Sequence, residues 1–450
     1  MGPSLAAIAL TSGWLPVVVD AAAAALLVVV LIRRPRRAPL VATALAGMLG
    51  VGVGLVLCWL LGDQLDLFDV SLSPSSRAWV GATFGGVGVA VAALTRPGRG
   101  HRIVGALTIP VVLLAGALGV NADFGQYPTI GSLAGRAVAA PVPAAVLTLQ
   151  RAGAQRADST GAEATAAVAL WKEIADGRLP ATGLRAHGLV GTVTIPAPVS
   201  HFPARPAYVY LPPAALTAHP VALPVMVLLA GQPGGPSNIV QSGKLAEILD
   251  AFAASHDGLA PIVVIPDQLA APQANPMCVD SALGNSETYL TVDVPRWIRT
   301  HLTVQTSQAA WAIGGFSQGG TCSIQLGAGH PELFGAIVDI SGQIAPQNGD
   351  LRQTIDRGFG GSSTAYAAAL PEHLLAMHGP YPDTVAVFGS GQFDSKYGPR
   401  AIEMAAAARA AGMRVTRVIS PGTAHDWHTV QWVLRTALGP IYRQLGLVAP

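Results

Sequence analysis

The pentad Gly-Phe-Ser-Gln-Gly at 315–319 places Ser317 in the G-x-S-x-G pattern of a nucleophile elbow. In such an elbow a strand turns sharply into a helix, which strains the serine backbone and exposes its hydroxyl. Glycines two residues on either side let the backbone pass without a Cβ clash. An apolar strand-like run, Ala310–Gly314, precedes Ser317, and a helix-forming run, Gly319–Gly329, follows it. This context favours a catalytic nucleophile over a plain glycine-rich turn.

An aspartate and a histidine follow Ser317 in the chain order that enzymes with this elbow use, which is Ser, then Asp or Glu, then His. Asp394 comes after the strand-like run Val385–Phe388 and a glycine turn, and His425 comes after Val415–Ile419 and a loop. We expect His425 to take the Ser317 proton and return it to the leaving group. Asp394 would hold the imidazole tautomer and offset its positive charge.

Other histidines and carboxylates compete for these roles, but each lies in the wrong place along the chain. One histidine lies three residues after His425, and two precede the acid and break the chain order. One carboxylate comes before its strand, and another falls within the following helical run. Chain order and loop position therefore favour His425 and Asp394. The competitors are His428, His373, His378, Asp383 and Glu403.

A glycine-rich loop after an early apolar run, Val225–Ala230, is the candidate oxyanion loop. In this architecture one oxyanion donor is the amide that follows the nucleophile, which here belongs to Gln318. The other comes from the early loop, where Gln232 is favoured because Pro233 has no N–H to donate. The alternatives are a simple turn and a donor from a neighbouring residue.

The elements that must position these residues are short apolar runs that alternate with helical stretches from Gly188 onward. Nearly continuous apolar strands that alternate with helices are typical of a mostly parallel sheet covered on both faces. The sequence therefore predicts one α/β domain over 188–450. The predicted strands are Val190–Ile195, Ala207–Leu211, Val225–Ala230, Ile262–Pro266, Ala310–Gly314, Ile337–Ile340, Val385–Phe388 and Val415–Ile419, and the predicted helices are Gln241–Ser255, Thr288–Leu302, Gly319–Gly329 and Pro399–Ala411.

The first part of the chain has the composition of a membrane region. Of the 450 residues 51% are hydrophobic and only 12% are charged, about half the charged share of ordinary soluble domains. Four windows that are almost free of charge approach or exceed the length that a helix needs to cross a bilayer. Glycine-rich stretches at 50–54 and 81–85 suit close contact between helices. We expect transmembrane helices at 14–32, 39–61, 78–95 and 103–121 within a region 1–122, followed by a connector at 123–187.

Charges in the loops predict the orientation of these helices. Arginines fill the first and third loops and aspartates the second, so the positive-inside rule places loop two and the catalytic half outside the cell membrane. A cleaved signal peptide is the alternative for the first window, but its basic cluster follows the apolar run. Asp20 is either an intramembrane functional carboxylate or, as we prefer, a residue near the outer interface. The loop charges are Arg33, Arg34, Arg36 and Arg37; Asp63, Asp66 and Asp69; and Arg96, Arg99 and Arg102.

Several classes of partner are not expected. The net charge is +2 and no basic stretch extends beyond 33–37, so nucleic-acid binding has no electrostatic footprint. The cysteines form no CxxC pair or His-spaced metal cluster, and a serine nucleophile needs only a base and an oxyanion site, so no metal or cofactor is expected. Cys278 and Cys322 form either a disulfide in an oxidising compartment or two unpaired small core residues.

Four segments together resemble the esterase family that includes esterase D-like hydrolases and the antigen 85 mycolyltransferases. They cover about 190–450 in the expected order, and together they are far more specific than the pentad. The resemblance implies an α/β-hydrolase fold and carboxyl-ester chemistry through an acyl-enzyme, with Ser317 and His425 mapped directly. In this family Cys278 follows a central strand near the pocket, which makes a bridge to Cys322 on the nucleophile helix a candidate. The segments are 287–298, 315–320, 330–334 and 422–427.

One departure from the mycolyltransferases concerns the acid. Their glutamate lies further from its strand, whereas Gly391-Gln-Phe-Asp394 resembles the hydrolase pattern. Mycolyltransferases are also usually secreted without a four-helix anchor. Both differences favour hydrolysis over transfer.

The sequence therefore predicts a membrane-anchored, extracytoplasmic serine carboxylester hydrolase that acts on envelope or lipid-linked esters. Its expected partners are an ester or acyl-lipid substrate and membrane lipid. The alternatives are an acyltransferase that moves a long acyl group to a glycan or lipid acceptor, an aminoacyl-lipid hydrolase, and an inactive membrane scaffold or sensor. The intact order of serine, aspartate and histidine argues against the last.

Overall fold

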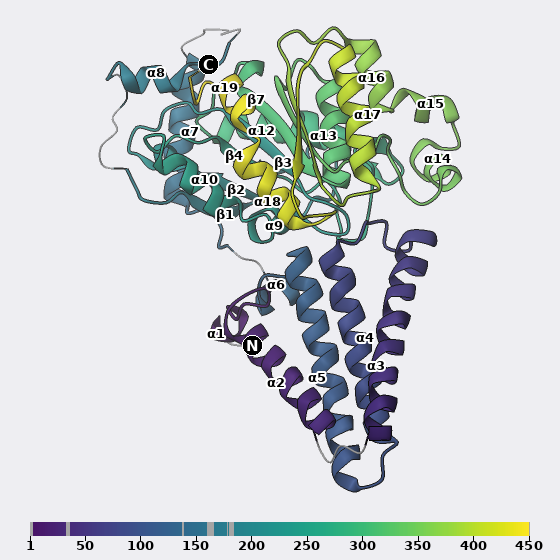
Figure 1. Ribbon diagram of the computed structural model, residues 1–450. Coiled ribbons are helices and arrows are strands. Elements are labelled where there is room, and N and C mark those ends of the chain that lie inside the picture. The colour runs from purple at the N-terminus through teal and green to yellow at the C-terminus, as the bar shows by residue number, and fades with distance from the viewer. Residues whose placement is uncertain are drawn as a thin grey trace. The chain divides into compact units, whose positions relative to one another are not determined.

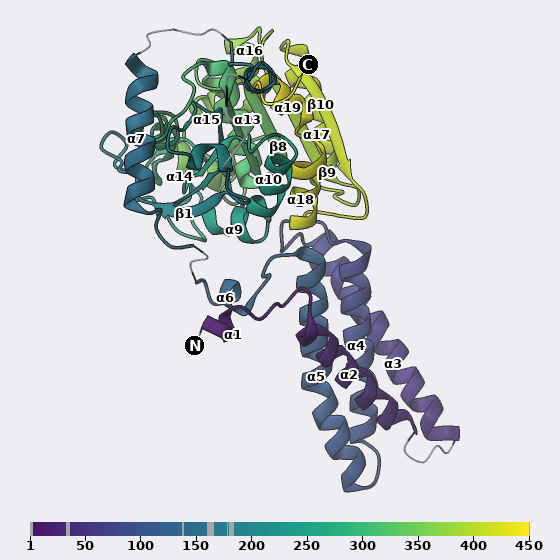
Figure 2. The same ribbon diagram turned by 90° about the vertical axis from the view of Figure 1, so that its left-hand side faces the viewer.

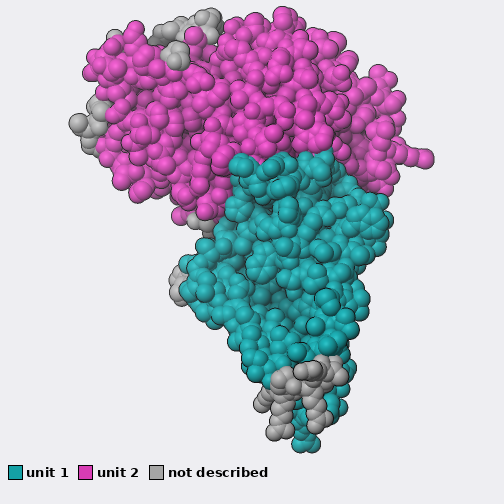
Figure 3. Space-filling view, in the orientation of Figure 1, with its two compact units in different colours: residues 1–138, 391–396, 421–428 teal, residues 139–390, 397–420, 429–450 magenta. Residues whose placement is uncertain are grey.

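The computed structural model describes residues 3–32, 37–136, 139–159, 166–177, 179 and 184–449. The chain forms two compact units (Figure 3). The first contains residues 1–138 and two short later segments, 391–396 and 421–428; the second contains the remainder of 139–450. Arg33, Arg34 and Arg36 of the predicted first loop lie outside the described residues.

Four long apolar helices make up most of the first unit (Figure 1). Each is long and apolar enough to cross a membrane, and each coincides with one of the predicted windows. The last three of these helices begin before their windows because polar residues at their ends continue the helix. The helices are α2 (Trp14–Ile32), α3 (Arg37–Leu57) continued by a π-helical turn (Cys58–Gln64), α4 (Pro74–Leu94) and α5 (Arg99–Phe124), with the short α1 (Pro3–Ala6) and α6 (Ile130–Leu133) beside them.

Glycines allow α3 and α4 to pack closely. A Cβ atom added at Gly50 would lie 2.2 Å from the carbonyl oxygen of Phe84, and one at Gly88 would lie 2.2 Å from that of Ala46. These separations are too short for any side chain, so the helix backbones can meet only where glycine is present. The close helix contact that was predicted for the glycine-rich stretch at 50–54 is therefore present.

The second unit is built on an eight-stranded sheet with the strand order β1-β2-β4-β3-β7-β8-β9-β10. The strands β1, β2 and β4 pair antiparallel, and β4, β3, β7, β8 and β9 pair parallel. The predicted mostly parallel sheet is confirmed, and all eight predicted strands belong to it. The strands are β1 (Leu189–Val193), β2 (Ala207–Leu211), β3 (Val225–Leu229), β4 (Ile262–Ile265), β7 (Trp311–Phe316), β8 (Ala336–Ile340), β9 (Val385–Gly391) and β10 (Arg414–Ser420).

Helices cover both faces of this sheet, as Figures 1 and 2 show. The nucleophile helix α13 (Gln318–Gly329) packs on β7 and β8 and against α16 (Pro371–His378). The four predicted helices are present. Gln241–Ser255 corresponds to α10 (Leu245–Ala254), which a separate short helix, α9 (Pro236–Gln241), precedes. Thr288–Leu302 is divided into α11 (Ser286–Thr288), a π-helical turn (Tyr289–Asp293) and α12 (Val294–His301), and the fourth prediction corresponds to α17 (Tyr397–Ala410).

Several elements of the second unit were not predicted. The helix α7 falls in the predicted connector, yet it packs within this unit, since the Gln150 side chain donates to the Ala215 carbonyl (2.7 Å) and accepts from the Thr303 amide (2.9 Å). Most of the others are too short to show a clear period in sequence. They are α7 (Ala144–Ser159), α14 (Leu351–Phe359), α15 (Ser363–Ala368), α18 (Trp427–Thr436), α19 (Gly439–Gln444), the hairpin β5 (Asp280–Ser281) and β6 (Gly284–Asn285), and 3-10 turns at Pro213–Leu216 and Gln308–Ala310. The unit also contains the short helix α8 (Leu170–Ala175).

Candidate active site

Ser317 stands between the end of β7 and the start of α13 in a strained backbone conformation. Its φ is 57° and its ψ is −118°, a region that residues other than glycine rarely adopt. Hydrogen bonds hold the turn in place, because the Ser317 amide donates to the Ile340 carbonyl (2.8 Å) and the Thr321 amide donates to the Ser317 carbonyl (3.0 Å). Strain of this kind is the mark of a nucleophile elbow, in which a strand turns abruptly into a helix.

Neighbouring backbone atoms lie so close to the two glycines of the pentad that no side chain fits at either position. A Cβ atom at Gly315 would lie 2.3 Å from the Gly319 carbonyl oxygen, and one at Gly319 would lie 2.4 Å from the Leu229 carbonyl oxygen. The elbow therefore presses against the end of β3 as well as against itself. Only glycine fits at either position.

Replacing Gly319 by alanine should lower the free energy of unfolding by about 3 kcal/mol, because the rigid backbone of β3 must move to admit the methyl group. Thermal unfolding of the purified full chain measures this loss. Gly398→Ala is the matched control, since its added Cβ would meet no atom closer than 3.8 Å. Equal melting temperatures for the two variants would contradict the tight elbow.

The candidate oxyanion loop lies next to Ser317. A Cβ atom at Gly231 would be 3.3 Å from the Ser317 Cβ atom. The buried Gln268 side chain joins the two segments, because its Nε2 atom donates to the Ala230 carbonyl (2.5 Å) and to the Gln318 Oε1 atom (3.0 Å). The Gln232 side chain is turned to the Gln273 carbonyl (3.1 Å). The loop that carries Gln232 and the start of α13 at Gln318 are thus joined through Gln268.

Cys278 and Cys322 are joined by a disulfide with an S–S distance of 1.99 Å. Cys322 lies on α13, one turn beyond the elbow, and Cys278 lies in the loop that follows β4. The Gln318 amide contacts this bridge, with its Nε2 atom 3.2 Å from the Cys322 sulfur and 3.1 Å from the Asn275 Oδ1 atom. The disulfide therefore fastens the 275–278 segment to the start of the nucleophile helix.

Reduction of this disulfide should lower the free energy of unfolding by about 4 kcal/mol, because an unbridged loop of 44 residues has far more conformational freedom in the unfolded chain. Denaturant unfolding with and without a thiol reductant measures the difference. A Cys58→Ala chain is the control, since it removes the free thiol and should respond to reductant as the unaltered chain does. An unfolding midpoint that is insensitive to reductant would contradict a stabilising bridge.

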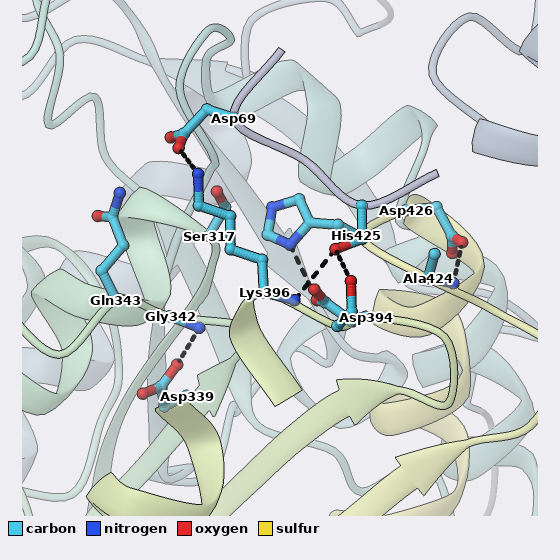
Figure 4. A network of polar contacts seen from close by, with 12 residues as sticks. Asp69, Ser317, Asp339, Gly342, Gln343, Asp394, Lys396, Ala424, His425 and Asp426 are labelled. Carbon is cyan, nitrogen blue, oxygen red and sulfur yellow. Dashed lines mark hydrogen bonds and ion pairs between the residues drawn. The ribbon is translucent and has the colours of Figure 1, made fainter. Parts of the chain in front are cut away.

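Asp394 and His425 form a buried pair within the first unit (Figure 4). The Nδ1 atom of His425 lies 3.1 Å from the Oδ2 atom of Asp394. The Asp394 side chain is 0% exposed and the His425 side chain 4%. With a carboxylate as partner, Nδ1 carries a proton and donates it, which leaves Nε2 as the basic nitrogen. This is the tautomer that a general base for a serine requires.

Backbone contacts tie the two loops that carry this pair, which we call the aspartate loop (391–396) and the histidine loop (421–428). The Phe393 amide donates to the Thr423 carbonyl (2.8 Å), and the Gly422 amide donates to the Gln392 Oε1 atom (2.9 Å). A Cβ atom at Gly391 would lie 2.2 Å from the Ala424 carbonyl oxygen. The loops are therefore packed so closely that the position of one fixes the other.

The competitors from the sequence do not join this pair. The His428 Nε2 atom donates to the Ala122 carbonyl (2.8 Å), and His373 and His378 lie on α16. Ser317 belongs to the second unit, whereas Asp394 and His425 belong to the first. The structure thus brings the predicted acid and base together, and it forms the predicted elbow separately.

Sequence reasoning missed two charged residues, one on β8 in the second unit and one in the aspartate loop. Asp339, in β8, is fully buried and accepts a hydrogen bond from the Gly342 amide (2.8 Å), and burial raises the pKa of its carboxyl to about 7. An aspartate within the apolar run 336–340 is visible in the sequence and could have indicated a buried carboxylate. Lys396, two residues after Asp394, gave no such signal, because its partners lie more than 300 residues earlier. Among the described residues, no group of three or more His, Cys, Asp or Glu side chains is placed to hold a metal ion.

The family described as "Putative esterase" matches residues 204–427. The matched segment begins before β2 and ends with the histidine loop, so it includes Ser317, Asp394 and His425. Residues 204–427 belong to this esterase family. The predicted resemblance to the esterases is confirmed.

Known proteins similar to this chain include an uncharacterised protein of Corynebacterium glutamicum. It is 38% identical over 283 residues, which cover 63% of this chain and 61% of the relative, so the alignment leaves more than a third of the relative unmatched. A solved ferulic acid esterase is 20% identical with a TM-score of 0.48, covering 58% of this chain and 99% of that one. An S-formylglutathione hydrolase from Agrobacterium tumefaciens is 18% identical with a TM-score of 0.48, covering 58% of this chain and 97% of that one.

Proposed function

We propose that this esterase-family chain is a serine carboxylester hydrolase in which Ser317, His425 and Asp394 act as a catalytic triad. The observation that carries the proposal is the buried Asp394–His425 pair, whose Nδ1 contact of 3.1 Å prepares the imidazole as a base. The strained elbow supplies the matching nucleophile. Both features follow strands in the order that the family uses.

In the proposed mechanism the Ser317 hydroxyl oxygen attacks the ester carbonyl carbon while the His425 Nε2 atom takes the hydroxyl proton. The resulting oxyanion accepts hydrogen bonds from the backbone N–H groups of Gln318 and Gln232. When the intermediate collapses, His425 returns the proton to the departing alcohol and an acyl-enzyme remains. Water, deprotonated by His425, then attacks the acyl carbon, and proton return to Ser317 releases the acid. Asp394 offsets the positive imidazolium charge in both half-reactions.

We further propose that α2, α3, α4 and α5 anchor the enzyme in the cell membrane with its catalytic part outside the cytoplasm. The outward faces of these helices carry large exposed apolar side chains, such as Leu49 (70% exposed) and Val17 (66%), which lipid would cover. The segment between the π-helical turn and α4 carries acidic residues, whereas Arg96 lies between α4 and α5 and two further arginines lie in the first turn of α5, which supports this orientation. An esterase that is tethered to a bilayer suits envelope or lipid-linked esters.

Labelling with a fluorophosphonate probe tests the proposed nucleophile. We expect one stoichiometric adduct, located on Ser317 by mass spectrometry of a proteolytic digest, and no adduct in Ser317→Ala. Failure of the native full chain to label would favour an inactive scaffold.

Product analysis with lipid or glycan acceptors present separates ester hydrolysis from acyl transfer. Free acid as the product supports hydrolysis, whereas an acylated acceptor would show that the chain is an acyltransferase.

A protease-protection assay on sealed cells tests the proposed orientation. A tag placed after residue 449 should be cleaved in intact cells by protease added outside. Cleavage only after the membrane is opened would contradict an extracytoplasmic catalytic part.

A further inference from the structure

The aspartate loop ends in a lysine that is paired with two carboxylates from the start of the chain. The Lys396 ammonium group forms ion pairs with Asp66 and Asp69, as Figure 4 shows for Asp69. The Lys396 side chain is only 18% exposed, and its partners are about half exposed. Both aspartates belong to the segment between the π-helical turn and α4, which we call the 66–71 loop. All these residues lie in the first unit.

A serine adds uncharged contacts to the same connection. The Ser71 Oγ atom accepts a hydrogen bond from the Lys396 amide (3.1 Å) and lies 3.1 Å from the Ser395 Oγ atom. Ser395 and Lys396, which directly follow Asp394, therefore contact the 66–71 loop through a backbone amide, a hydroxyl and an ammonium group. An isolated surface ion pair contributes little, but several contacts to one short loop restrict its conformation.

The histidine loop is held in the same way by the end of α5. The Trp427 indole N–H donates to the Gln126 Oε1 atom (2.6 Å), and the His428 Nε2–H donates to the Ala122 carbonyl (2.8 Å). Gly125, with a φ of 67°, ends the helix, and a Cβ atom there would lie 3.3 Å from the Trp427 Cβ atom. Trp427 comes two residues after His425. Both catalytic loops are thus anchored on segments that connect or end the apolar helices.

We propose that the 66–71 loop and the end of α5 position Asp394 and His425 for catalysis, with Lys396 as the principal positioning residue. The apolar helical region is then a part of the catalytic apparatus as well as an anchor. This inference rests on the proposed esterase function. Its physical basis is that a misplacement of about 1 Å in a catalytic group can cost about 100-fold in rate, and a loop keeps its geometry only when neighbouring groups support it.

Kinetics of the full chain in detergent micelles test the proposal with a short p-nitrophenyl ester. Lys396→Met should lower kcat about 10- to 100-fold with little change in KM, because it disturbs the pair that reacts and not the binding of the ester. Lys396→Arg should keep most of the activity, since it retains the charge. Arg435→Met is the matched control: it breaks the exposed Arg435–Glu247 ion pair (2.9 Å), whose two residues lie outside both loops, and should leave kcat unchanged.

A spectroscopic measurement follows the Asp394–His425 pair without relying on turnover. The proton on His425 Nδ1 should give a low-field NMR signal in the native chain and in Arg435→Met, and the signal should be lost or shifted in Lys396→Met. A native signal together with native kcat in Lys396→Met would overturn the positioning role, and so would equal losses in Lys396→Met and Lys396→Arg. Full esterase activity in Ser317→Ala would instead refute the proposed function, whatever Lys396 does.

Discussion

Ser317→Ala should lower kcat for a short p-nitrophenyl ester by about 10⁶-fold. The proposed reaction passes through an ester bond between Ser317 and the acyl group, and alanine has no atom to form it. The oxyanion donors and the bound orientation of the substrate would remain, so a residual rate of about 10³- to 10⁴-fold over uncatalysed hydrolysis is expected. The strained backbone of residue 317 should tolerate alanine, because no large side chain is added.

The measurement is steady-state hydrolysis by the full chain, with burst kinetics to detect the acyl-enzyme. Ser341→Ala is a closely matched control. Ser341 is also a buried serine that follows a sheet strand, β8, and it also has a positive φ of 51°. We expect its replacement to leave kcat within a factor of about three. Comparable activity in Ser317→Ala and the native chain would show that the elbow is a structural turn.

Asp394→Asn should lower kcat by about 10⁴-fold while leaving the fold intact. The asparagine amide can donate a hydrogen bond to His425 Nδ1, which would move the imidazole proton to Nε2. The nitrogen intended to accept the serine proton would then have no free lone pair. Because the Asp394 side chain is 0% exposed, water cannot easily replace the missing carboxylate.

Steady-state kinetics and the rate of fluorophosphonate labelling measure this effect together, since both depend on the basic Nε2 atom. Asp383→Asn is the control: Asp383 is the competitor that comes before β9, and it is exposed. Its replacement should change neither rate. A loss on Asp383→Asn with none on Asp394→Asn would transfer the acid role and contradict the assignment.

Much of the α/β domain was predictable because the patterns that indicate its strands lie within short segments of the sequence. Most of the eight sheet strands are apolar runs bounded by turn residues, and β10 (Arg414–Ser420) alternates β-branched residues with arginines, so their positions could be predicted to within a few residues. The order of the strands in the sheet, with β4 between β2 and β3, was not predicted. Strand order depends on which surfaces pack together, and no short segment contains that information.

Local patterns also explain which parts of the second unit were missed. The helix α7 is polar and alanine-rich, and it packs within the second unit through Gln150 contacts to Ala215 and Thr303. Partners 65 and 153 residues away in sequence decide that packing. The β5–β6 hairpin is supported by a similar distant contact, because the Asn285 side chain donates to the Ser200 carbonyl 85 residues earlier (2.9 Å).

By itself, the sequence determined the esterase family, the apolar helices and the residues proposed for the triad. These rest on chain order, on glycine spacing around Ser317 and on strand-loop patterns before Asp394 and His425. Only the tertiary structure decided how the acid and base loops are supported. The Lys396 contacts to Asp66 and Asp69 join residues that are 330 and 327 positions apart. Charged pairs at such separations leave no pattern in one sequence, because proximity comes from the folded path of the chain.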